Sequence, residues 1–238
     1  MRNSGNWIRQ AIRAVACVVM LASSLSAAAE TVEVAPGVHV TKRTYAAPTN
    51  EQPFFGFAVK DSAQQAADAN FVNAIIPAAG TREKAFEETS KRGWRAINAG
   101  RMGEAAQRFN QAFLISPEQS AVYHGFATVT QIRFRDLDAA EELFKIALKQ
   151  PNPGKALNAD YGRLLLIAKR PRDAQPVLEQ AVKDAPDLGD AWTNLAVARF
   201  QNGHVAAACA AAEEAAKQRP SNNSGSDLTA VRNAAQCK

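Results

Sequence analysis

Between Gly189 and Pro220, apolar residues recur at the spacing of two amphipathic helices joined by a turn at residues 201–203. The apolar positions of the two helices are Trp192, Leu195 and Ala196, then Ala208, Ala212 and Ala215. The proline closes the second helix because it cannot continue the hydrogen-bond ladder. This stretch therefore predicts a helical hairpin that buries one face of each helix.

The same outline recurs upstream at a nearly constant period. Prolines occupy positions 117, 151, 186 and 220, so the intervals are 34, 35 and 34 residues. A period of that length predicts a solenoid of helix pairs, each burying its apolar face against its neighbours. The second repeat contains one inserted residue near Arg135. The predicted repeats span residues 86–119, 120–154, 155–188 and 189–222.

These units resemble the tetratricopeptide repeat, whose pattern is W-x2-L-G-x2-Y, then A-x3-F-x2-A, then proline. The matching second-helix positions are Ala105, Phe109 and Ala112; Ala140, Phe144 and Ala147; Ala174, Leu178 and Ala181; and Ala208, Ala212 and Ala215. In the last repeat, Ala196 replaces the glycine and Ala212 replaces the aromatic residue. The resemblance covers residues 86–222 and implies an all-α fold, an α-solenoid of about four stacked helix-turn-helix repeats.

Residues 1–29 have the three parts of a secretory signal peptide. Three arginines precede an apolar run at residues 14–25, and small residues at 26–29 place cleavage near Ala29. A retained anchor is the alternative, but spanning a bilayer takes about 20 apolar residues. Lipidation at Cys17 is disfavoured because no bulky residue stands three places before it. The sequence predicts a periplasmic or secreted protein that meets the membrane only through a transient signal peptide.

Residues 30–60 form a less regular N-terminal arm. Valines alternate on both sides of Pro36-Gly37, which predicts a short hairpin or, equally, an extended arm with little structure. Phe54, Phe55 and Phe57 are expected to pin the arm to the helical body, or to fill its groove in cis. Residues 61–85 contain a predicted N-terminal helix, capped by Asp61 or Ser62 and ended by Pro77 and Gly80. The inner face of this helix is expected to carry Ala66, Ala69, Val72 and Ile76.

Residues 223–238 are predicted to form a C-terminal capping helix or a frayed tail. A turn at residues 221–225 would precede it, and Ser226 or Asp227 would cap a helix that reaches Gln236, with Leu228 and Val231 facing inward. If that helix runs antiparallel to its predecessor, Cys237 returns within about one turn of Cys209. A disulfide between these two cysteines is therefore expected in an exported protein, and two free thiols are the alternative.

No catalytic or cofactor-binding motif occurs in the chain, so the sequence predicts a protein that is not an enzyme and needs no cofactor. The histidines and cysteines lack the spacing of a metal site. An active site in the Phe-rich arm would have no supporting set of residues. The net charge of +5 falls to +2 without residues 1–29, which hold three of the 28 basic and none of the 23 acidic residues. That balance gives no support to nucleic-acid binding.

The resemblance implies that the first helix of each repeat lines a concave groove for a peptide or partner protein. Trp94 is either an anchor for that partner or part of the core. A clamp for a terminal carboxylate is not expected. Asn194 occupies one position of such a clamp, but the equivalent positions in neighbouring repeats hold Gly125 and Asp160. The candidate partner-binding residues are Ser90, Trp94, Asn98, His124, Thr128, Gln131, Arg163, Ile167, Thr193 and Val197.

The function predicted from these features is a non-catalytic scaffold or adaptor in the cell envelope. The alternative is a structural or self-associating module whose arm fills the groove or mediates oligomerisation. The sequence leaves open the partner's identity and the oligomeric state.

Overall fold

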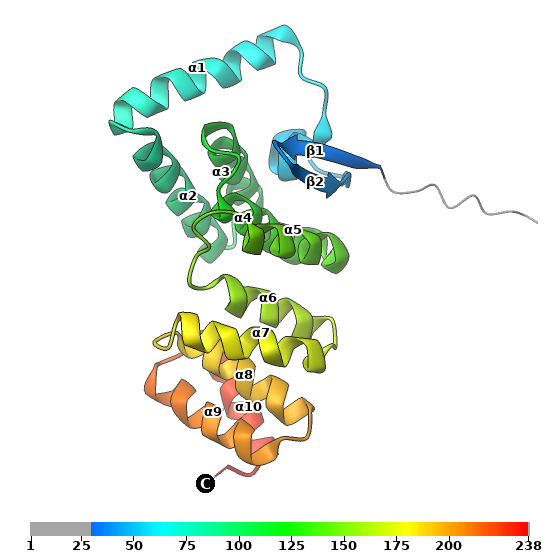
Figure 1. Ribbon diagram of the computed structural model, residues 1–238, viewed down its shortest axis with the longest axis vertical. Helices are drawn as coiled ribbons and strands as arrows, with labels where there is room; N and C mark the ends of the chain where they lie inside the picture. The colour runs from blue at the N-terminus through cyan, green and yellow to red at the C-terminus, as the bar shows by residue number, and fades with distance from the viewer. Residues whose placement is uncertain (1–29, 238) are drawn as a thin grey trace, which may run out of the picture.

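The computed structural model describes residues 30–237, and Figure 1 shows a column of helix pairs that starts beside a small hairpin. The predicted signal peptide, residues 1–29, lies outside the described residues. Four helix pairs follow one another along the column, and the helices within each pair contact each other extensively. The pairs are α2 (Arg82–Asn98) with α3 (Met102–Ile115), α4 (Ser120–Val129) with α5 (Leu137–Lys149), α6 (Leu157–Ile167) with α7 (Pro171–Asp184), and α8 (Gly189–Gln201) with α9 (Val205–Lys217). The prediction of an all-α repeat solenoid is confirmed.

The close contact between the helices depends on glycines that face large side chains. Phe109 of α3 is fully buried, and its ring lies between Gly93 of α2 and Gly125 of α4. A Cβ atom at Gly93 would lie only 2.8 Å from that ring. In the third repeat, Leu178 of α7 packs against Gly162 of α6 in the same way. The small and large residues that alternate in the sequence therefore meet where one helix packs against the next.

The inserted residue of the second repeat is accommodated in a π-helical turn, η3 (Thr130–Phe134), which continues α4. A π turn takes one more residue than an α turn, so it absorbs an insertion without displacing the helix that follows. Arg135 ends the turn in a left-handed conformation, with φ 55°. Asp136 then caps α5, because its side chain accepts a hydrogen bond from the backbone N–H of Ala139.

The N-terminal arm is a hairpin followed by two short turns. Strands β1 (Thr31–Ala35) and β2 (Val38–Thr41) pair antiparallel, which is the hairpin alternative of the two that the sequence allows. The hairpin lies beside α5, where the backbone N–H of Thr41 donates to Glu142 at 2.8 Å. Two 3₁₀-like turns follow, η1 (Thr49–Glu51) and η2 (Pro53–Phe57), and both contact α3.

Helix α1 (Ser62–Ala79) differs from its prediction in two ways. Pro77 does not end the helix, which continues to Ala79 and stops at Gly80. A proline in the last turn removes only one hydrogen bond, and its own carbonyl still accepts from the N–H of Gly80 at 3.2 Å. None of the 18 residues of α1 is buried, so the expected inner face is at most half-buried.

The last helix, α10 (Asn222–Ala234), starts earlier than predicted. Residues 221–225 are not a separate turn, because the N–H of Gly225 already donates to the carbonyl of Ser221 at 2.7 Å, as in a helix. Ser221 precedes the helix, and its own N–H donates to Asp190 of α8 at 2.7 Å. The helix stops at Ala234, short of the predicted Gln236. Asp227 therefore lies inside the helix and does not cap it.

The end of the chain is fastened to the last repeat. Cys209 of α9 and Cys237 form a disulfide, with their Cα atoms 5.4 Å apart. Leu228 and Val231 of α10 are buried in the continuous core of the solenoid. Helix α10 thus covers α8 and α9, the last helix pair in the column (Figure 1).

Candidate functional site

The first helices of the four repeats, α2, α4, α6 and α8, carry the predicted groove positions on what we call the first-helix face. In the first two repeats this face is closed by side-chain packing. Trp94 meets the Phe109 ring at 5.4 Å and the His124 ring at 4.5 Å, both edge to face. Ser90 and Thr128 are also buried, and Trp94 is half-buried against the core of the solenoid.

His124 connects two repeats. The side chain is buried, and its Nε2 lies 2.7 Å from Oδ2 of Asp160 on α6. Its carbonyl accepts a hydrogen bond from the Thr128 hydroxyl at 3.0 Å. With its ring nitrogen paired and its ring packed on Trp94, His124 holds α4 to α6 and is not positioned to meet a partner. Of the other positions in these repeats, Asn98 is exposed at the end of α2 and Gln131 is half-buried in η3.

The first-helix face opens in the last two repeats. Arg163, Ile167 and Val197, three of the predicted positions, border one cleft of about 350 Å³, whereas Thr193 is fully buried and donates to the Gly189 carbonyl. We call this hollow the C-terminal cleft. Its lining comes from α6, α8 and α10 and consists of Arg163, Leu166, Ile167, Val197, Phe200, Gln201, Asp227, Ala230, Val231 and Ala234.

The C-terminal cleft is apolar along its length and polar at its ends. Ile167 is 47% exposed, a large fraction for an isoleucine in a cleft. At one end, Arg163 donates to Oδ1 of Asn194 at 3.2 Å and forms an ion pair with Asp227. The wall supplied by α10 was missed in the site prediction, although the inward-facing pattern of Leu228 and Val231 was visible in the sequence.

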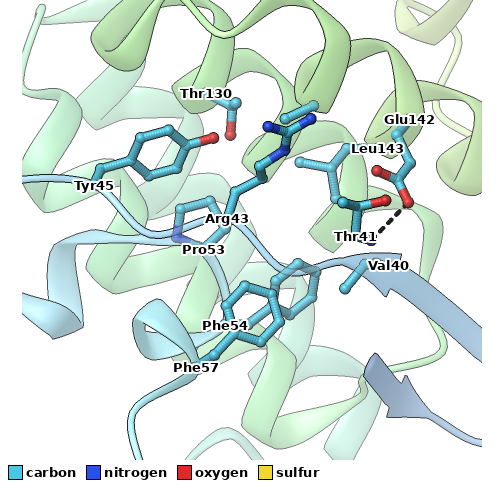
Figure 2. Close-up of a pocket in the computed structure, with 11 residues that line it drawn as sticks. Val40, Thr41, Arg43, Tyr45, Pro53, Phe54, Phe57, Thr130, Glu142 and Leu143 are labelled. Atoms are coloured by element: carbon cyan, nitrogen blue, oxygen red, sulfur yellow. Dashed lines mark hydrogen bonds between the residues drawn. The ribbon is translucent and has the colours of Figure 1, made fainter. Parts of the chain in front are cut away.

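A second hollow lies between the N-terminal arm and α5, and Figure 2 shows its lining. Its volume of about 20 Å³ has room for little more than one water molecule. Phe54 enters it from the arm, and Tyr45 stacks on Phe134 with ring centroids 3.9 Å apart. The arm therefore packs on α3, α4 and α5 of the first two repeats, and none of its residues lines the C-terminal cleft. The arm therefore does not fill the C-terminal cleft, as the alternative would require.

Ionisable residues between the second and third repeats have shifted pKa values. Burial favours a higher pKa for Glu141, but hydrogen bonds from Arg170 and Lys145 outweigh it and lower the pKa. Burial, helped by Glu141, raises the pKa of Tyr161 to about 12. Glu141 accepts hydrogen bonds from Arg170 at 2.5 Å and from the Tyr161 hydroxyl at 3.1 Å, which ties the second repeat to the third. The shifts are explained by this network of ion pairs and hydrogen bonds between the second and third repeats.

The part of the chain that the structure describes holds neither a metal site nor a membrane-spanning helix. Within residues 30–237, no three His, Cys, Asp or Glu side chains come together in a way that would hold a metal ion. No helix in the same range combines the length and apolar character needed to cross a bilayer.

The fold and the cleft together define an α-solenoid of stacked helical hairpins. Residues 162–223 match the family model of the tetratricopeptide repeat. Folds of this type generally mediate protein–protein interaction. The match covers α6 to α9, the part of the chain that forms most of the C-terminal cleft. Among curated protein sequences, none is similar enough to count as a match.

Solved structures show the same fold. One from a functional characterisation of Pseudomonas aeruginosa pilF has a TM-score of 0.56 and 20% identity, covering 65% of this chain and 71% of that one. Yeast Tom70 has a TM-score of 0.51 and 20% identity, covering 72% of this chain and 39% of Tom70. The Cut9–Hcn1 hetero-tetramer of the APC/C has a TM-score of 0.51 and 18% identity, covering 70% and 37%. At these identities the likeness concerns the fold alone.

Proposed function

We propose that this protein is a non-catalytic adaptor that binds an apolar peptide segment of a partner protein in the C-terminal cleft. The observation that carries the proposal is the apolar lining of the cleft, where Ile167 is exposed and Val197 and Phe200 are half-buried. These residues lie in the part of the chain that matches the tetratricopeptide repeat, a fold that generally mediates protein–protein interaction. An open cleft with an apolar floor and a few polar groups at its ends suits a side chain that inserts from outside. The closed packing around Trp94 leaves the first two repeats with a structural role.

We further propose that the adaptor works in the cell envelope after cleavage near Ala29. The disulfide between Cys209 and Cys237 supports this setting, because such bonds persist in oxidising compartments and are rare in the cytosol. The disulfide also helps the proposed site, since it fastens the end of α10, which is one wall of the cleft.

The cleft can be tested with peptides selected on the purified protein from a random library. We expect Ile167→Glu to weaken the selected peptides by about tenfold or more, because it places an unpaired carboxylate in an apolar contact. Fluorescence anisotropy with synthetic peptides would measure the change. Val205→Glu is the matched control, since Val205 of α9 is 44% exposed and lies outside the cleft. Equal loss in both variants, or loss in neither, would contradict a binding site in the cleft.

The envelope setting can be tested by the intact mass of the protein made in a bacterium from the full-length sequence. We expect a chain that begins at Glu30 and is lighter than the reduced form by two hydrogens, because Cys209 and Cys237 are joined. Cell fractionation should find it in the periplasm or the medium. A chain that still begins at Met1, in the membrane fraction, would instead support the retained anchor.

A further inference from the structure

Next to the C-terminal cleft, a further hollow of about 390 Å³ lies at the turn between α6 and α7. Gln201 lines both hollows, so they share a border. We call the second one the basic ledge, because three of its lining residues are Lys169, Arg170 and Arg172. An occupant of the cleft that extends past Gln201 meets these cations.

Two of the three cations have no partner within the described residues. Arg170 donates to Glu141 at 2.5 Å and to Asp173 at 2.7 Å, so its charge is balanced. Lys169 and Arg172 are exposed, and neither makes a side-chain hydrogen bond or ion pair with residues 30–237. The basic ledge therefore offers about two positive charges that the chain itself does not neutralise.

The opposite end of the C-terminal cleft carries no unpaired charge among the residues that line it. Arg163 is satisfied there by Asp227 and Asn194, and a charged partner group would have to break that pair. The cleft thus has a direction: a neutralised end, an apolar middle at Ile167 and Val197, and a cationic end at the basic ledge. Along α6, the rise from Arg163 to Ile167 is about 6 Å at 1.5 Å per residue, and the basic ledge begins just after the helix ends.

We infer that the ligand of this cleft is a peptide with a bulky apolar residue followed or preceded, within about three positions, by two or more acidic residues. Lys169 follows Ile167 by only two residues, and an extended peptide advances about 3.3 Å per residue. Acidic side chains one to three positions from an anchor over Ile167, about 3 to 10 Å along the peptide, therefore fall near the basic ledge. The inference rests on the proposed function, because it names the partner chemistry of the same cleft. It differs from a clamp on a terminal carboxylate, since side chains within a segment would satisfy it.

Three labelled peptides of equal length test the inference on the full mature chain. The acidic probe contains Leu-Phe-Ser-Asp-Glu-Asp, the amide probe Leu-Phe-Ser-Asn-Gln-Asn, and the anchorless probe Ala-Ala-Ser-Asp-Glu-Asp. We expect the acidic probe to bind about tenfold more tightly than the amide probe at low salt, and this preference to shrink at about 0.5 M salt. The anchorless probe should bind weakly at any salt concentration.

Charge-reversal variants then locate the preference. The double variant Lys169→Glu with Arg172→Glu should abolish the preference and leave binding of the amide probe unchanged. The control variant Lys155→Glu with Lys183→Glu makes the same change in net charge at exposed positions outside the cleft and ledge, and should retain it.

The outcomes separate the two proposals. If the amide probe binds and Ile167→Glu removes it, but the acidic probe is no tighter, the cleft is a binding site and the acidic preference is wrong. Equal effects of the ledge and control variants would also overturn the inference, since they would show only the net charge of the protein. Failure of every probe to bind would count against both proposals.

Discussion

Replacing Gly125 with alanine is expected to lower the free energy of unfolding by about 3 kcal/mol, at the upper end of the range for an overpacked core. A methyl group on this residue of α4 would overlap the ring of Phe109. The ring has no room to move away, because Gly93 of α2 also lies against it. The Trp94 ring packs edge to face with it, and the ring centroids are 5.4 Å apart. Urea unfolding followed by circular dichroism would measure the loss.

Two further variants show whether the clash with the ring is the cause. Phe109→Leu removes part of the ring, so combining it with Gly125→Ala should cost less than the sum of the two single changes. Gly154→Ala is the matched control, because nothing lies within 4 Å of a Cβ atom at that position and its φ is not positive. A Gly125→Ala protein as stable as the wild type would show that the helices separate at little cost, and the packing argument would fail.

The part of the fold that was predicted correctly is the part that repeats. The first and third repeats encode the same local contact, a small residue on one helix facing a large one on the other, as with Gly93 and Phe109 or Gly162 and Leu178. Prolines and glycines in the sequence mark where the helices end. These signals lie within one repeat, so they can be read from a short stretch of sequence without knowing how the repeats stack.

The candidate site was harder to predict because it depends on contacts between repeats. The family pattern places Trp94 and Arg163 at the same position of their repeats, yet the first packs against the rings of Phe109 and His124, and the second borders an open cleft. What separates them is the neighbouring side chains, which the repeat pattern does not specify. The wall from α10 was misjudged for a related reason: Asp190 of α8 receives a hydrogen bond from Ser221, and α10 starts directly afterwards.

The conformation of the arm could not be predicted from the sequence, for a different reason. Phe54, Phe55, Gly56 and Phe57 all have φ between 54° and 62°, a left-handed turn. Each residue other than glycine costs roughly 1–2 kcal/mol in this conformation. No local preference of phenylalanine predicts it, so the docking of the turn on the helices must stabilise it.

That docking has two parts. Asn110 of α3 is fully buried and clamps the backbone of the arm: its side-chain amide donates to the carbonyls of Asn50 and Gln52, at 3.0 and 2.8 Å, and its oxygen accepts from the N–H of Phe55 at 3.1 Å. The ring of Phe54 inserts among aromatic rings of α3 and α4, with centroids 4.8 Å from Phe126 and 5.5 Å from Phe113.

Phe54→Ala is therefore expected to cost about 4 kcal/mol, as for other buried phenylalanines, and to release the arm. Hydrogen exchange should show lost protection in residues 30–60 and little change in α6 to α10, because stability in a solenoid passes mainly between neighbouring repeats. Phe55→Ala is the matched control: it has the same left-handed backbone, but its ring is only half-buried, with the Lys60 ammonium 3.2 Å from the ring centroid. If the two variants release the arm equally, the Asn110 clamp holds the turn and the Phe54 ring is not its anchor.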